Sequence, residues 1–278
     1  MNDLYAFYAN RLNAKEVDLI QSEKTWDRRA AEVSRFTVSD DDFAMGVLER
    51  HQDLKDVRVL DISFGAGRYL AEFLRRGAQI SGIEISSGMI KHAIENLQKL
   101  GLSFNPADLH HLPWQQVDLK QLGWQEAFDL VFLYMTPAIS SVEMLDKVLA
   151  ASRHGVYVTL YAHREDRLLI ELQDHFELPR QAVGAKNTHD IYDLFNLLYL
   201  KGYSPEVVWE ERVRQSQYDV DYIVERYASW LWRGEGDADA NRARLSEVLN
   251  TRLVDGQVCS ESRDVIGHLY VDKRLKRN

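Results

Sequence analysis

The fold is decided by one stretch of the chain, Val59-Leu60-Asp61-Ile62-Ser63-Phe64-Gly65-Ala66-Gly67-Arg68-Tyr69-Leu70. Its first part is a short apolar run typical of a buried strand, and residues 69–76 have the apolar spacing of a helix. Glycines between a strand and a helix permit a tight turn and let backbone N–H groups at the helix start approach a ligand. The stretch therefore predicts a strand, a ligand-binding turn and a helix.

Strand-like and helix-like segments alternate on either side of this turn. Strands are expected at residues 57–62, 79–85, 103–108, 128–134, 155–162, 206–213 and 265–273. Helices are expected at residues 69–76, 88–100, 142–151, 166–176, 189–201, 220–232 and 238–253. Because such alternation is typical of a sheet covered by helices on both faces, we predict a doubly wound, mostly parallel, seven-stranded α/β fold.

Three regions are expected along the chain. A helical N-terminal cap would span residues 1–50, and the α/β domain would comprise residues 51–213 and 261–278. A helical insertion near the C-terminus would span residues 214–260. The Gly-Glu-Gly-Asp sequence at 234–237 indicates a break between two helices of this insertion.

Composition excludes several classes of protein. The chain has 278 residues, 45% of them apolar, and a net charge of −9, which disfavours binding to phosphate backbones and anionic lipid surfaces. Its single cysteine, Cys259, cannot form an intramolecular disulfide or a cysteine-based metal site, and no metal is expected. No apolar run approaches the roughly 20 residues that span a bilayer, and the N-terminus lacks a basic segment before an apolar one. We expect no signal peptide and no anchor, and hence a cytoplasmic protein.

A carboxylate after the second expected strand indicates the kind of cofactor. Glu84 lies 19 residues after Gly65, where a carboxylate can accept hydrogen bonds from both hydroxyls of a ribose. Leu70 occupies the third small position of a dinucleotide fingerprint, which weakens the NAD interpretation, and no P-loop motif is present. Asp61, four residues before Gly65, suits a ligand with a positive end, such as an amino acid's ammonium group. This polarity favours S-adenosylmethionine.

Four ordered segments resemble motifs of the class I S-adenosylmethionine-dependent methyltransferase family. Residues 61–67 resemble its first motif, acidic-x-Gly-x-Gly-x-Gly, and residues 82–89 its ribose and adenine segment. Residues 106–114 are similar to its Gly-Asp-Ala-x-x-Leu-Pro-Phe segment, and residues 126–131 to the opening of its fourth strand. The resemblance covers residues 50–165 and implies the Rossmann-like methyltransferase fold with S-adenosyl-L-methionine as cofactor.

The resemblance also implies a set of cofactor-binding residues. They are Trp26, Asp61, Ser63, Gly65, Gly67, Glu84, Ile85, Met89, Asp108, Leu109 and Tyr134. Glu84 would bind the ribose, Asp108 and the Leu109 N–H the adenine, and Asp61 the ammonium group, directly or indirectly. Ser63 departs from the family pattern, because it replaces the first glycine. The turn must therefore accommodate a β-carbon, or the chain must adopt a β-region conformation there.

The residues assigned to the cofactor could instead have purely structural roles. The candidates for substrate binding and catalysis are weaker. Ile85 and Met89 could be plain core, Asp61 a helix cap, Asp108 a loop residue, and Trp26 a packing residue instead of a cover over the cofactor. Candidate substrate-lining residues are Tyr5, Tyr8, Met135, Thr136 and Trp230, although packing is the better interpretation for the two tyrosines and the tryptophan. His163, after the fifth strand, is a weak candidate for a general base.

The sequence supports three hypotheses about function. The first is an S-adenosylmethionine-dependent methyltransferase that acts on a small molecule. The second is a protein that binds S-adenosylmethionine or S-adenosylhomocysteine without turnover, and the third, which Leu70 disfavours, is a nicotinamide-dependent oxidoreductase. The methyl acceptor, its nucleophilic atom and the oligomeric state do not follow from the sequence.

Overall fold

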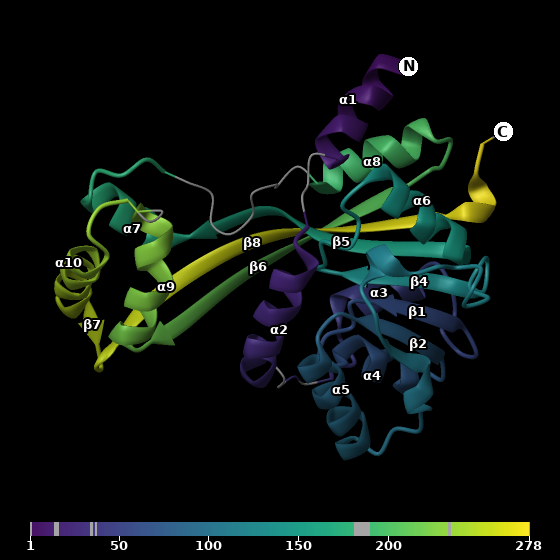
Figure 1. Cartoon of the computed structure of the whole chain (residues 1–278), viewed down its shortest axis with the longest axis horizontal. Coiled ribbons are helices and arrows are strands. Elements are labelled where there is room, and N and C mark those ends of the chain that lie inside the picture. Colours follow the sequence, from purple (N-terminus) through teal and green to yellow (C-terminus); the bar gives the residue numbers. More distant parts are fainter. Residues whose placement is uncertain are drawn as a thin grey trace. The chain divides into compact units, whose positions relative to one another are not determined.

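A computed structural model describes residues 2–13, 17–33, 36, 38–180, 190–232 and 235–277 of the chain. Its strands form one sheet in the order β3-β2-β1-β4-β5-β8-β6, with β7 paired to β8 (Figure 1). The strands are β1 (Arg58–Ile62), β2 (Gln79–Glu84), β3 (Leu109–His111), β4 (Phe128–Tyr134), β5 (Ser152–Asp166), β6 (Glu206–Tyr218), β7 (Leu253–Val254) and β8 (Gln257–Asp272). The predicted fold class is confirmed by this seven-strand path and by its parallel pairings.

Ten α-helices are described along the chain. They are α1 (Asn2–Asn13), α2 (Leu19–Val33), α3 (Phe43–Glu49), α4 (Arg68–Arg75), α5 (Ser87–Lys99), α6 (Val142–Ala151), α7 (Arg167–His175), α8 (Asp190–Leu200), α9 (Val220–Trp232) and α10 (Ala238–Asn250). The 3-10 turns are η1 (Pro106–Asp108), η2 (Trp114–Gln116) and η3 (Lys273–Leu275). Among the described residues, no helix combines the length and apolarity needed to cross a membrane.

The parallel part of the sheet is buried on both faces. β1 pairs in parallel with β2 and β4, β2 with β3, and β4 with β5. Val59 and Leu130 pack with residues of α3 and α4 on one face, and the residues that follow them, Leu60 and Val131, are equally inaccessible on the other. Since all carboxyl ends of parallel strands lie at one edge, the loops after β1, β2 and β4 meet there.

The predicted third strand at residues 103–108 is wrong. Pro106 has no N–H for a strand ladder, and the Asn105 side chain accepts a hydrogen bond of 3.2 Å from the Ala107 N–H, which starts the 3-10 turn η1. The strand follows this turn as β3, and its register places His111 beside Glu84 of β2. Asp108 therefore precedes β3 instead of ending it.

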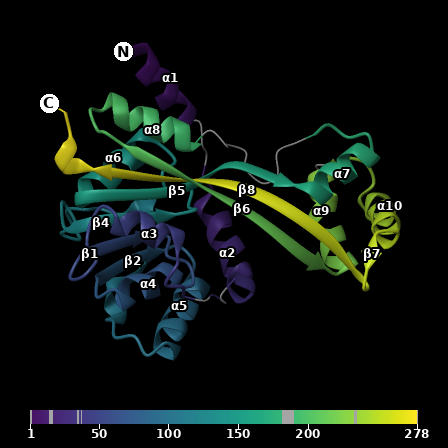
Figure 2. The same cartoon turned by 180° about the vertical axis from the view of Figure 1, so that it is seen from behind.

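The chain divides into two compact units, which are described separately here. The first comprises residues 1–160, 189–209 and 267–278, and the second comprises residues 161–188 and 210–266. The second unit contains α7, α9, α10 and β7, with residues of β5, β6 and β8 (Figure 2). It thus takes in residues 161–188, 210–213 and 261–266, which the sequence analysis assigned to the α/β domain. The predicted boundaries at 50, 213 and 260 stay a prediction.

Candidate active site

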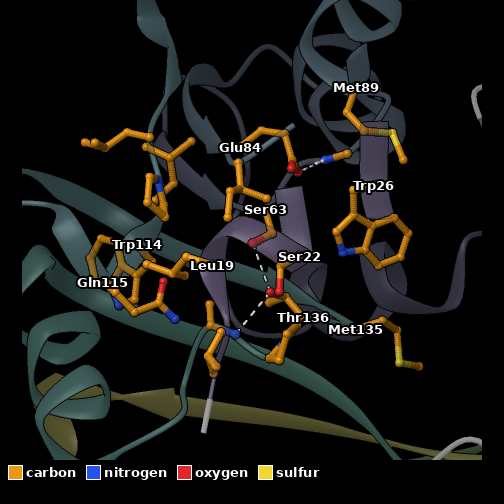
Figure 3. A pocket seen from close by; sticks show the side chains of 18 of the residues that line it. Leu19, Ser22, Trp26, Ser63, Glu84, Met89, Trp114, Gln115, Met135 and Thr136 are labelled. Atoms are coloured by element: carbon orange, nitrogen blue, oxygen red, sulfur yellow. Dashed lines mark hydrogen bonds between the residues drawn. The ribbon is translucent and has the colours of Figure 1, made fainter. Parts of the chain in front are cut away.

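A pocket of about 410 Å³ opens in the first unit at the carboxyl ends of β1, β2 and β4 (Figure 3). The loops after these strands form its base, and α2 contributes side chains from the N-terminal extension. Its lining residues are Val17, Leu19, Ser22, Trp26, Ser63, Gly65, Ala66, Ile83, Glu84, Ile85, Met89, Leu112, Pro113, Trp114, Gln115, Tyr134, Met135, Thr136, Pro137 and Ala138.

The turn after β1 has the conformation of a ligand-binding glycine loop. Ser63, Gly65 and Gly67 all have positive φ angles, of 66°, 56° and 87°. A β-carbon at Gly67 would lie 3.0 Å from the Ala93 Cβ, so this glycine also allows α4 to approach α5. Of the two conformations considered for Ser63, the turn accommodates its β-carbon, and the β-region alternative is wrong.

Glu84 holds the glycine turn from the neighbouring strand. One carboxylate oxygen accepts a hydrogen bond of 2.9 Å from the Gly65 N–H, and the other accepts one of 2.9 Å from the Ser86 N–H. Burial raises the pKa of Glu84, whereas these backbone hydrogen bonds act in the opposite direction. A carboxylate has four lone-pair sites, so both oxygens retain the capacity to accept from a ligand in the pocket.

Asp61 lies beneath this turn and is 1% exposed. Neither of its carboxylate oxygens has a hydrogen-bond partner among the described residues. Burial, and secondarily the charge of Glu84, raises the pKa of Asp61 well above its ordinary value. A buried carboxyl without a partner is rare in folded proteins, and it marks this position as one that a polar or cationic group could satisfy.

The helix α2 is fixed beside the pocket by a residue that the sequence analysis did not single out. Asp27 accepts hydrogen bonds of 2.6 Å from the Ser86 hydroxyl and 3.0 Å from the Gly88 N–H. The Ser86 hydroxyl, followed by the Gly88 N–H, lowers the pKa of Asp27. Trp26, which precedes Asp27, and Ser22, one turn earlier in α2, line the pocket (Figure 3).

The segment after β3 forms another wall of the pocket. Leu112, Pro113, Trp114 and Gln115 line it, and Trp114 is 2% exposed. Only the resemblance to the Leu-Pro-Phe segment pointed to this part of the chain, because sequence spacing had placed the third strand earlier. Ser22, Leu19 and Val17 could not be found from a motif, since their position depends on how α2 packs.

Nine of the predicted site residues lie together at the pocket. They are Trp26, Ser63, Gly65, Glu84, Ile85, Met89, Tyr134, Met135 and Thr136. Asp61 belongs to β1 and Gly67 to the adjoining turn, but neither lines the pocket, and neither do Asp108 and Leu109. The Leu109 side chain packs in the core beside Gly82 instead. The roles assigned to all these residues stay predictions.

The other candidates are not among the lining residues. Tyr5, on α1, lies under the Lys201 ammonium group at 5.4 Å from its ring centre, and Tyr8 contacts Phe7 edge-to-face at 5.1 Å. His163 and Trp230 belong to the second unit. There the two residues contact neighbours of their own: His163 lies 3.7 Å from the Glu165 carboxylate, and Trp230 stacks on Tyr227 at 5.6 Å.

Comparison with known proteins identifies the domain that contains this pocket. Residues 59–155 match the family model described as "Methyltransferase domain". An uncharacterized protein of Haemophilus influenzae is 35% identical over 66 residues, which cover 23% of this chain and 26% of that protein. The match therefore spans about a quarter of that relative. This part of the chain is a methyltransferase domain, which agrees with the predicted resemblance to the class I S-adenosylmethionine-dependent methyltransferase family.

Solved structures of low sequence identity resemble the chain. A SAM-dependent methyltransferase from Aquifex aeolicus is 13% identical, with a TM-score of 0.42 and coverage of 90% of this chain and 99% of that one. The YcgJ protein from Bacillus subtilis is 16% identical, with a TM-score of 0.48 and coverage of 84% and 98%. Magnesium protoporphyrin IX methyltransferase from Synechocystis, with bound SAH, is 13% identical, with a TM-score of 0.42 and coverage of 95% and 99%. These likenesses do not decide the substrate of this chain.

S-adenosyl-L-methionine is the cofactor of this family, and the residues present fit it. The unsatisfied Asp61 carboxyl suits an ammonium group, and the Glu84 carboxylate has lone pairs left for ribose hydroxyls. The pocket is mainly apolar otherwise, with Ile85 and Met89 in its wall. The donor set therefore agrees with a nucleoside that carries a positively charged amino-acid end.

Proposed function

We propose that this protein is a methyltransferase that transfers the methyl group of S-adenosyl-L-methionine to a small-molecule acceptor. The observation that carries the proposal is the pocket at the strand ends, in which Glu84 holds the glycine turn and Asp61 lies unsatisfied beneath it. The net charge of −9 disfavours a nucleic-acid acceptor, and we propose a cytoplasmic location.

In this proposal the cofactor occupies the side of the pocket formed by β1 and β2. Glu84 accepts from the ribose hydroxyls, Ile85 and Met89 contact the adenine, and Asp61 balances the ammonium group, directly or through water. Trp26 on α2 covers the cofactor. Bringing a cation near Asp61 would favour the ionised form of that carboxyl.

The acceptor would bind on the side formed by the loop after β4 and by the residues before and within α2. Leu19, Met135 and Pro137 make this side largely apolar, while Gln115 and Ser22 supply an amide and a hydroxyl. A pocket of about 410 Å³ is within the range of small-ligand sites, which supports an acceptor of low molecular mass.

Methyl transfer needs alignment more than it needs a catalytic side chain. A lone pair of the acceptor forms the new bond to the methyl carbon as the carbon–sulfur bond breaks, and its electron pair stays on sulfur. The bound cofactor supplies the electrophilic methyl group. The protein contributes by holding both reactants in line and by excluding water, and α2 and the loop after β4 are suited to that role.

Calorimetric titration tests the cofactor assignment. Purified protein should bind S-adenosylmethionine and S-adenosylhomocysteine with micromolar affinity, about −8 kcal/mol, and should not bind NAD. Glu84→Gln should weaken this binding roughly tenfold or more, because hydrogen bonds to a charged group are lost. Glu95→Gln removes an equal charge from a surface carboxylate of α5 that faces His92, and it should leave the affinity unchanged.

Turnover is tested with radiolabelled methyl donor and a panel of small thiols, amines, phenols and carboxylates. Transfer to one class would establish the enzyme and name its acceptor. Tight cofactor binding without transfer to any class would instead support a binding protein without turnover, which the serine in place of the first motif glycine favours. Binding of NAD alone would contradict both.

A further inference from the structure

The second unit contains an enclosed polar cavity of about 200 Å³ that the methyltransferase proposal does not use. Three guanidinium groups line it: Arg164 from β5, Arg214 from β6 and Arg226 from α9. Within this unit the strands follow the order β5-β8-β6, so β8 contributes residues between the first two arginines (Figures 1 and 2). The cavity is therefore built by residues from four elements.

One buried carboxylate serves two of these arginines. Asp264 of β8 is 1% exposed, and one of its oxygens accepts a hydrogen bond of 3.1 Å from the Arg164 Nε. Its other oxygen accepts from Arg214. Asp264 thus neutralises one of the two positive charges, and the Arg164 terminal nitrogens have no hydrogen-bond partner among the residues that the structure describes.

The second buried carboxylate, that of Asp166, accepts hydrogen bonds from groups other than the arginines. Asp166 accepts hydrogen bonds of 3.0 Å from the Ser260 hydroxyl and 3.2 Å from the Leu169 N–H, and another from the Tyr227 hydroxyl. Burial, followed by the charge of Asp166, raises the pKa of Tyr227, so this phenol stays a donor. Asp166 therefore caps α7 and holds α9 rather than pairing with the arginines.

The remaining acidic residue at the cavity has other partners. Glu165 lies 3.7 Å from the His163 ring nitrogen. Arg164 and Arg214 share the one carboxylate of Asp264, which leaves one positive charge of this pair in excess. Such a charge in a partly buried site is stabilised by an anion, and guanidinium groups suit carboxylate and phosphate oxygens.

Hydroxyl groups complete the lining. Ser216 of β6 and Ser262 of β8 line the same cavity as the arginines, and each can donate to an oxyanion. A network that served only to join the strands would not need an open polar volume beside the terminal nitrogens of Arg164. We propose that this cavity is a binding site for a small oxyanion, of the phosphate or carboxylate class, independent of the S-adenosylmethionine pocket.

The probes are inorganic phosphate, sulfate and malonate, titrated calorimetrically into the full-length protein at constant ionic strength with chloride as the balancing anion. Saturable binding of phosphate and sulfate identifies a phosphate-type site, and preferential binding of malonate identifies a carboxylate site; either supports the proposal. Arg214→Gln should weaken the binding roughly tenfold or more. The Arg214 side chain is 51% exposed, so this variant should fold.

Two further variants distinguish specific binding in this cavity from nonspecific attraction of anions by positive charge. Ser262→Leu fills the cavity without changing the charge and should abolish the binding. Arg263→Gln removes the same charge from the neighbouring position of β8, where the side chain is 58% exposed and pairs with Glu211, and it should bind as the wild type does. The proposal is overturned if folded wild-type protein shows no saturable binding, or if Arg263→Gln loses as much affinity as Arg214→Gln.

Discussion

Ser63 and Thr136, which follow the neighbouring strands β1 and β4, are joined by a hydrogen bond of 2.9 Å from the Thr136 Oγ1 to the Ser63 Oγ. The Thr136 hydroxyl oxygen also accepts from the Ala138 N–H at 3.2 Å. This bond ties together two loops of the pocket at the position where Ser63 has a φ of 66°. The serine thus supplies a link between loops that a glycine at this position could not make.

Substitution of Ser63 should separate the backbone strain from the hydrogen bond. Ser63→Ala keeps the left-handed backbone but removes the bond, so the free energy of unfolding should fall by about 1 kcal/mol. Ser63→Gly also removes the bond but relieves about 1 kcal/mol of strain, so its stability should stay near that of the wild type. Urea unfolding measures both. If Ser63→Ala were as stable as the wild type, the bond would contribute nothing.

The unsatisfied carboxyl of Asp61 predicts a pH dependence of stability. Its pKa is raised in the folded state, so the folded protein holds this proton more tightly than the unfolded chain does. This contribution to stability is fully present below the unfolded-state pKa, and it is lost as the pH rises from about 4 toward the folded-state pKa. Asp61→Asn cannot ionise and should lack this loss.

The measurement is the free energy of unfolding of both proteins from acid to neutral pH. The stability of Asp61→Asn relative to the wild type should rise with pH across that window. Asp56→Asn, at an exposed position, changes the net charge equally and serves as the control. A stability difference that is independent of pH would show that Asp61 does not have a raised pKa.

The cofactor side of the site could be predicted because its signals are local. Asp61, Gly65 and Glu84 are fixed by one strand–turn–helix unit and the strand beside it, so their spacing along the chain is nearly sufficient to place them. Ser22 and Asp27 gave no such signal. Their position depends on the packing of α2 against α5, which links residues about 60 positions apart.

The third strand was predicted at the wrong residues, and the full length of the long strand β6 was not predicted. These two errors have different physical reasons. Residues 103–108 have strand-like composition, but Pro106 and the Asn105 side chain favour a turn there. In β6 the residues after Val213 include Arg214, Gln215 and Ser216, and they lack the apolar alternation that indicates a half-buried strand. The polar cavity of the second unit was not predicted either, because the residues of β6 that line it lack this apolar alternation.

Removal of Asp27 should loosen α2 without unfolding the domain. Asp27→Ala removes the acceptor for the Ser86 hydroxyl and the Gly88 N–H, each bond contributing about 1 kcal/mol or less at this exposed position. Backbone amides of α2 should exchange with deuterium faster, and S-adenosylmethionine should bind several-fold more weakly, because side chains of α2 line the pocket. Lys24→Ala, also exposed on α2, is the control and should change neither.

Two glycine-to-alanine substitutions should have opposite effects on stability. At Gly82 of β2 a β-carbon would lie 2.5 Å from the Phe64 ring, and Phe64 belongs to the buried part of the glycine turn. Gly82→Ala should therefore reduce the free energy of unfolding by about 1–3 kcal/mol and weaken cofactor binding, because Phe64 must move.

At Gly46 of α3 nothing lies within 4 Å of the added carbon. Gly46→Ala should stabilise the protein by about 0.5–1 kcal/mol, since alanine favours a helix, and it should leave the affinity for S-adenosylmethionine unchanged. Thermal unfolding with and without the cofactor measures both effects, and equal affinity in the two variants would show that Phe64 does not support the turn.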